Sequence, residues 1–183
     1  MTVSATIGLM RVGAWAAMAA GALRIATTFI PYEANAAPLE ALYAIIDLGL
    51  VFGLIAIYLA IADAVGVAGL LAFIVALSGL TSIVGPDAIM LGVDFYRIGA
   101  LIFVLGLAGL AFQLLRARTL RATAALWLLT LAASLASAFI PQAFLAAGLT
   151  LGAGYVLAGA FLLRARKAVR RPLSPPKHAY PEC

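Results

Sequence analysis

The stretch "LYAIIDLGLVFGLIAIYLA", residues 42–60, decides the fold, because only one of its residues, Asp47, is charged. The hydrocarbon core of a bilayer is about 30 Å thick, and roughly 20 apolar residues cross it as a helix. The apolar residues run on continuously instead of alternating with polar ones, which is typical of a helix and not of a strand in a membrane barrel. The stretch therefore predicts a membrane-spanning helix with one charge inside it.

The composition of the whole chain indicates the same class of protein. Of the 183 residues, 66% are hydrophobic and 10% are charged, and the mean hydropathy is +1.14. A soluble domain averages about half apolar and about a quarter charged residues, and a domain of this size could not bury so much apolar surface. We therefore expect an integral membrane protein.

Further apolar windows of spanning length follow one another along the chain. The predicted spans are 7–30, 40–62, 66–84, 95–115, 122–140 and 143–163. No segment between them is long enough for a separate soluble domain. The sequence thus predicts an all-α, six-transmembrane-helix bundle over residues 1–164 and a basic, proline-rich tail over residues 165–183.

The distribution of basic residues predicts the orientation of the spans. With six spans, both termini lie on one side, and that side would hold ten of the twelve lysines and arginines. By the positive-inside rule we expect a multi-pass inner-membrane protein with cytoplasmic N- and C-termini. The net charge of +5 then reflects topology, so we expect anionic lipids as partners of the basic side and no nucleic acid.

An A-x-A pattern within "EANAAP", residues 33–38, is the alternative to a retained first span. After a basic and then apolar segment, such a pattern can mark signal-peptide cleavage. Because Arg24 interrupts the apolar region, we expect the first span to be retained.

A regular spacing of prolines predicts an internal repeat. Pro31, Pro86 and Pro141 follow three predicted spans at a constant spacing of 55 residues, and Thr27, Ser82 and Ser137 each stand four residues earlier. Proline tends to end a helix, and a hydroxyl one turn earlier can bond to carbonyls left unpaired there. The pattern predicts three helical hairpins in a parallel repeat; coincidence in an Ala- and Leu-rich background is the alternative.

Two charges lie inside predicted spans. Arg24 lies about 9 Å below the outer end of the first span and Asp47 roughly 10–12 Å below the same surface, at ~1.5 Å per residue. A lone arginine at depth costs about 2.5–3.5 kcal/mol on insertion scales, so we expect a buried polar pair of Arg24 and Asp47. Three interpretations remain open: a structural ion pair, a site that binds or relays an ion, proton or small anion, or an arginine that snorkels to the interface beside a protonated aspartate.

Small residues at four-residue spacing predict close helix packing. On the first span they share a face with Arg24, which would then point inward, whereas on the second span they lie on a different side from Asp47. The candidate packing residues are Gly13, Ala17, Gly21, Gly49, Gly53, Gly148 and Gly152.

Motifs for catalysis or cofactor binding are missing from the sequence. It contains no Walker, dinucleotide-binding, HExxH or CxxC motif, its single histidine and single cysteine lie in the tail, and no cluster of carboxylates lies within a span. We therefore expect no enzyme activity, no catalytic residues, no cofactor and no metal site.

Two functional hypotheses follow from these features. The abundance of small residues favours a non-catalytic accessory or scaffold subunit that associates with a membrane-protein partner or with a second copy of itself. The alternative is a small transporter or channel that uses Arg24 and Asp47. The predicted third, fifth and sixth spans carry few polar side chains, which favours the first hypothesis: Ser78, Thr81, Ser82, Thr130, Ser134, Ser137 and Thr150.

Overall fold

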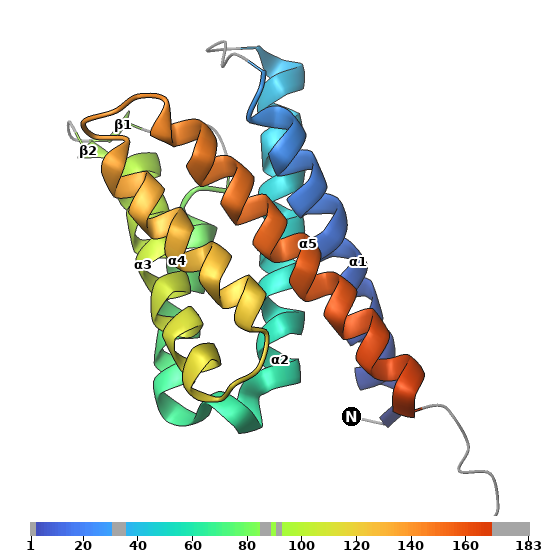
Figure 1. Cartoon of the computed structure of the whole chain (residues 1–183). Coiled ribbons are helices and arrows are strands. Elements are labelled where there is room, and N and C mark those ends of the chain that lie inside the picture. Colours follow the sequence, from blue (N-terminus) through green and yellow to red (C-terminus); the bar gives the residue numbers. More distant parts are fainter. Residues whose placement is uncertain (1–2, 31–35, 85–88, 91–92, 170–183) are drawn as a thin grey trace, which may run out of the picture.

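The computed structural model describes residues 3–30, 36–84, 89–90 and 93–169, in which five helices form a bundle (Figure 1). The elements are α1 (Val3–Thr27), α2 (Ala37–Ser82), β1 (Ile89–Met90), β2 (Val93–Asp94), α3 (Phe95–Arg116), α4 (Arg121–Ala136) and α5 (Ala143–Val169). The tail beyond residue 169, with its proline-rich segment, lies outside the described residues. The helical fold class agrees with the sequence-based prediction.

Helix α2 is 46 residues long and reverses its direction at Gly66. The backbone of Gly66 has φ 59° and ψ −158°, a region that is essentially restricted to glycine. The rings of Tyr58 and Phe73 stack with their centroids 4.2 Å apart, although fifteen residues of a straight helix would separate them by about 22 Å. Residues 37–65 and 67–82 are therefore two arms folded against each other, called here the first and second arm of α2 (Figure 1).

Five helices are described, whereas the sequence predicts six. The segments expected at 40–62 and 66–84 correspond to the two arms of α2, which meet directly at Gly66, a residue whose backbone is not helical. Helix α1 begins earlier than predicted and α5 extends to Val169, whereas α4 ends at Ala136 and not near residue 140.

Four of the described helices are long and apolar enough to cross a membrane. They are Gly8–Thr27 within α1, Ala37–Ser82, Phe95–Arg116 and Ala143–Arg164 within α5. Helix α4 has 16 residues, which corresponds to about 24 Å and falls short of the roughly 30 Å hydrocarbon core. These apolar helices indicate a membrane protein.

The surface of the bundle supports this conclusion. Large apolar side chains lie more than half exposed on several helices and on the turn before α5, among them Val12, Ile45, Val67, Leu71 and Phe139. The largest fully buried side chains include Trp127, Tyr155, Leu50, Leu54 and Leu107. Exposed apolar area of this extent is typical of a surface that faces lipid.

The helices pack in a ring-like order along the chain. Helix α1 contacts both α2 and α5, α3 contacts α2 and α4, and α4 contacts α5. The start of α1, the bend of α2, the α3–α4 connection and the end of α5 lie at one end of the bundle, called here the basic end because Arg116, Arg118, Arg121 and Arg164 lie there (Figure 1). The end of α1 and the starts of α3 and α5 lie at the opposite end, called here the ribbon end.

A two-stranded antiparallel ribbon, which the sequence did not predict, gives the ribbon end its name. Ile89 pairs with Asp94 and Met90 pairs with Val93. Each strand has only two residues, so the hydropathy windows that identify spans cannot detect the ribbon.

Hydroxyl groups bond to backbone carbonyls where three helices end. The hydroxyl of Thr27 donates to the carbonyl of Arg24 at 3.2 Å, and that of Ser82 donates to Ser78 at 2.7 Å. The hydroxyl of Ser137 donates to the carbonyl of Ser134 at 2.7 Å. Pro141 lies exposed in the turn before α5, whereas Pro31 and Pro86 lie outside the described residues.

Candidate functional site

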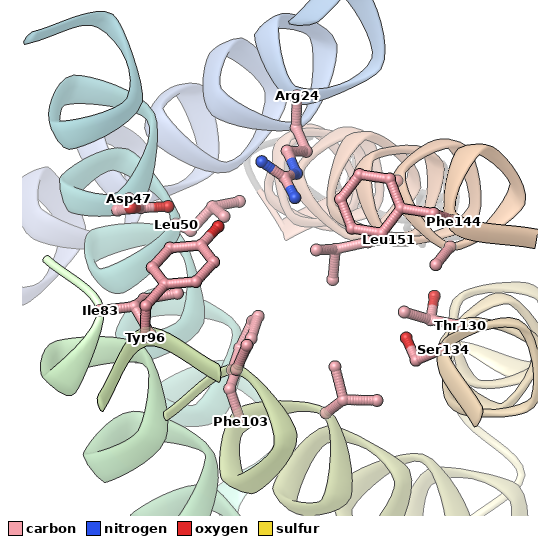
Figure 2. A pocket seen from close by; sticks show the side chains of 14 residues that line it. Arg24, Asp47, Leu50, Ile83, Tyr96, Phe103, Thr130, Ser134, Phe144 and Leu151 are labelled. Atoms are coloured by element: carbon pink, nitrogen blue, oxygen red, sulfur yellow. The ribbon is translucent and has the colours of Figure 1, made fainter. Parts of the chain in front are cut away.

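A cavity of about 100 Å³ lies between the helices, which is room for several water molecules. It is called here the central cavity. Every helix of the bundle contributes to its wall (Figure 2). Its lining consists of Arg24 from α1, Asp47 and Leu50 from α2, Ile83 after α2, Tyr96, Ala100, Phe103 and Val104 from α3, Thr130 and Ser134 from α4, and Phe144, Ala147, Gly148 and Leu151 from α5.

Arg24 enters the central cavity from the last turn of α1. Its guanidinium carbon lies 5.9 Å from the centroid of the Tyr43 ring, within the range of a cation–π interaction. Its Nε atom is buried and has no hydrogen-bond partner among the described residues. A buried N–H without a partner is rare, so this side chain presents an unused donor at the site.

Asp47 lies on the first arm of α2 and is only 7% exposed. Gly49 and Gly53 on the same arm lie against Ala20 and Ala17 of α1, and they bring these two helices into close contact. Asp47 is offset from these glycines around the helix, so its side chain lines the central cavity with residues of α3, α4 and α5. A nearly buried carboxylate on a mostly apolar wall requires a partner or a polar ligand.

The two charges share the central cavity, but no ion pair of 4.0 Å or less joins them in the part of the chain that the structure describes (Figure 2). The sequence places them at similar depth, and the structure puts both on the wall of one cavity. The direct ion pair itself stays a prediction. The arrangement differs from a closed clasp because both side chains line a cavity, together with Tyr96 (Figure 2).

Helix α4 provides hydroxyl groups on another wall of the central cavity. The hydroxyl of Thr130 donates to the carbonyl of Leu126 at 2.9 Å and lies 2.9 Å from the hydroxyl of Thr150 on α5. Ser134 lies one turn further along α4 and lines the same cavity. In the sequence, Thr130 and Ser134 are only two of the few polar side chains of the predicted spans. Their spacing of four residues indicates that both lie on one face of the helix.

The position of the lining residues shows where the central cavity lies along the bundle. Ile83, Tyr96 and Phe144 are at or near the ends of helices at the ribbon end. Phe144 is 58% exposed, whereas Leu151, two turns further into α5, is buried. The cavity therefore lies away from the basic end, in the half of the bundle nearest the ribbon.

Two further buried polar groups lie one turn below the central cavity, on the side of the basic end. Trp127 precedes Thr130 on α4, Tyr155 follows Leu151 on α5, and their ring centroids are 5.6 Å apart. The Trp127 Nε1 and the Tyr155 hydroxyl are buried without a hydrogen-bond partner among the described residues. The sequence analysis did not identify either polar group, because aromatic residues in an apolar span are interpreted first as packing residues.

The candidate packing residues lie against helices of the same chain. Gly13 lies against Ala56, Gly21 against Gly152, Gly49 against Ala20, Gly53 against Ala17, and Gly148 against Thr28. A further close contact that the sequence analysis did not identify joins the second arm of α2 to α3, where Gly79 lies against Phe103 and Gly106 against Ala76. The small-residue faces are thus used within one molecule.

Asp94 and Arg97 at the start of α3 form a helix cap. The Oδ1 atom of Asp94 accepts a hydrogen bond from the backbone N–H of Arg97 at 2.9 Å, which is the usual geometry of an N-cap. Within the described residues no group of three or more His, Cys, Asp or Glu side chains gathers that could hold a metal ion.

Comparisons with protein-family models, with curated proteins and with solved structures find no match to this chain. The functional conclusion therefore depends on the central cavity itself.

Proposed function

We propose that the chain is a multi-pass inner-membrane protein that takes a small polar solute or ion into the central cavity, as a small transporter or channel does. The observation that carries this proposal is the pair of charges, Arg24 and Asp47, on the wall of one cavity to which all five helices contribute. Ionisable residues inside membrane helices are expensive and mark substrate or ion pathways in many membrane proteins. We propose no enzymatic reaction for this site.

The accessory or scaffold hypothesis is the weaker of the two. Its main support in the sequence was the abundance of small-residue faces. Those faces lie against helices of the same chain, for example Gly21 against Gly152, so they do not call for a membrane-protein partner or a second copy. A partner could still contact the large apolar side chains on the outer surface, but lipid covers such side chains equally well.

The proposal includes six membrane crossings: α1, the two arms of α2, α3, α5, and the predicted span 122–140, in which the 16 residues of α4 are followed by the apolar residues 137–140. The reversal at Gly66 supports counting the two arms as separate crossings, and hydroxyl-capped ends at Thr27, Ser82 and Ser137 support three hairpins in a parallel repeat. The basic end would face the cytoplasm by the positive-inside rule, with the tail and anionic lipids beside it. The central cavity would then lie toward the opposite, non-cytoplasmic side.

Accessibility of a single cysteine tests this proposal. Cys183 is the only cysteine of the chain, so Cys183→Ser provides a cysteine-free background. In this background, Ser134→Cys places a thiol on the wall of the central cavity, and Leu135→Cys places one on a neighbouring side chain that is 54% exposed on the outer surface of the bundle.

We expect a membrane-impermeant methanethiosulfonate reagent, added to intact cells from outside, to label Ser134→Cys at least about tenfold faster than Leu135→Cys, because only a hydrated thiol ionises and reacts. Labelling of both thiols at the same slow rate would contradict a water-filled cavity. Faster labelling from the cytoplasmic side, in inverted vesicles, would contradict the proposed orientation and leave the cavity in place.

A further inference from the structure

We infer that the central cavity binds a small zwitterion of the size of a simple amino acid, with its anionic group at Arg24 and its cationic group at Asp47. This inference deepens the proposed function and depends on it. The structure places a guanidinium and a carboxylate on the wall of one cavity, contributed by two different helices (Figure 2).

The charge pattern of the wall selects against ligands with a single charge. An anion at Arg24 would face the carboxylate of Asp47, and a cation at Asp47 would face the guanidinium of Arg24. Like charges facing each other in a desolvated site oppose binding strongly. A molecule with both charges avoids both conflicts, and each of its charged groups gains an opposite charge that forms no ion pair of 4.0 Å or less among the described residues.

The contacts of Arg24 leave at least one of its donors available. Among the described residues, Arg24 lies over the Tyr43 ring, forms no ion pair of 4.0 Å or less, and has a buried Nε without a hydrogen-bond partner. The close contact of Gly49 and Gly53 with α1 positions the first arm of α2, from which Asp47 reaches the cavity. Guanidinium N–H groups bind carboxylates by short, charge-assisted hydrogen bonds.

The size and the walls of the cavity limit the ligand further. A volume of about 100 Å³ accommodates a compact molecule, and Leu50, Phe103 and Leu151 give it apolar surroundings. A zwitterion with a long or branched side chain would need the walls to move. The ligand class is therefore a small α-amino acid or a similarly compact betaine.

Protection of Ser134→Cys from labelling, in the Cys183→Ser background, tests this inference. The probes are glycine, alanine, proline and glycine betaine, compared with acetate and methylammonium, each of which carries half of the charge pattern. We expect at least one zwitterion to slow labelling about tenfold at a concentration at which acetate and methylammonium slow it less than about twofold, because each half faces an unpaired like charge.

The variants Arg24→Gln and Asp47→Asn sharpen the result. We expect each to weaken protection by the zwitterion about thirtyfold or more, because the charged group of the ligand loses its partner in a desolvated site. If either variant fails to fold, the comparison of zwitterions with acetate and methylammonium still tests the inference, because it needs neither variant.

Four results would overturn the inference. Protection by acetate equal to that by the zwitterions would show an anion site, and equal protection by methylammonium would show a cation site. Rapid labelling that none of the probes slows would show a cavity that holds water alone; the hydrated site of the proposed function would then stand without the zwitterion. If Ser134→Cys is not labelled at all, the proposed function fails, and this inference fails with it.

Discussion

The helices α1 and α5 are in close contact with each other, and other residues of the same two helices line the central cavity. Where Gly21 lies against Gly152, a Cβ atom on Gly152 would come within 2.5 Å of the carbonyl oxygen of Gly21, and at Gly159 a Cβ would lie 2.6 Å from the carbonyl oxygen of Ala14. This closely packed contact is called here the glycine seam. Toward the ribbon end, Arg24 and Leu151 of the same two helices line the central cavity.

The difference teaches that side-chain size sets the separation of helices in this bundle. Between helices in lipid there is little hydrophobic driving force, so association depends on packing and on interhelical hydrogen bonds. Glycines let α1 and α5 touch along the seam. Beside the cavity α1 and α5 stay close, because Gly148 lies against Thr28. The cavity lies between this pair and the other helices, whose larger side chains supply the rest of its wall. The seam stabilises the fold, whereas the cavity serves the site.

The largest effect is expected from breaking the glycine seam. Gly152→Ala adds a Cβ against the backbone of Gly21, which cannot move aside as a flexible side chain could. We expect a loss of about 3 kcal/mol in the free energy of unfolding, at the upper end for overpacked interiors, measured by denaturant titration in mixed micelles.

Gly8→Ala is the matched control for this substitution. A Cβ on Gly8 would meet nothing within 4 Å, so we expect stability to rise by about 0.5–1 kcal/mol, because alanine is more favourable than glycine inside a helix. Equal effects of the two substitutions would show that the seam is not a tight contact.

A smaller loss is expected from Gly66→Ala, which affects the reversal that returns the second arm of α2 and Ile83 to the wall of the cavity. A Cβ at Gly66 would have free space around it, but its φ of +59° with this ψ suits glycine alone. We expect a loss of about 2 kcal/mol, within the range for a residue held in a sparsely populated backbone region, by the same titration. Unchanged stability would mean that the bend does not require this conformation.

The smallest effect is expected at the hydroxyl pair beside the cavity. Thr130→Val removes the 2.9 Å interaction with Thr150 that links α4 to α5. Interhelical hydrogen bonds in membrane proteins average about 0.6 kcal/mol, so we expect a loss of that order. In a double-mutant cycle, Thr150→Val should add little once Thr130 is replaced; fully additive losses would show that the two hydroxyls act independently.

The sequence predicted those parts of the fold that depend on local pattern. Continuous apolar runs predict helices, and the four-residue spacing of Gly49 and Gly53 placed these residues on a contact face while Asp47 pointed elsewhere. The direct join of the two arms of α2 at Gly66 was not predicted, because a short loop and a sharp bend have the same hydropathy. The early end of α4 was missed for a similar reason: residues 137–140 are as apolar as the helix before them.

The candidate site could be predicted only in part. Arg24 and Asp47 stand out because a charge inside an apolar run is unfavourable. The remaining walls of the central cavity come from α3, α4 and α5, and which faces of these helices meet depends on packing between residues far apart in the chain. Thr130 and Ser134 carry no mark in the sequence that shows that they reach the cavity, because helical hydroxyls commonly bond to their own backbone, as Thr130 does to Leu126.

We propose that the glycine seam stabilises the fold while Arg24 and Asp47 serve the site. Replacing both buried charges at once is the most direct test of this proposal. In the double variant Arg24→Met with Asp47→Leu, apolar side chains of similar length take the place of the two charges. If the charges serve the solute and the glycine seam holds the bundle, the free energy of unfolding should stay the same or rise by about 1 kcal/mol or more, as when buried charges are exchanged for apolar residues. Protection of Ser134→Cys by every zwitterion should disappear in the same variant. A loss of about 3 kcal/mol or more, which is typical of a broken buried pair, would show instead that Arg24 and Asp47 hold the helices together.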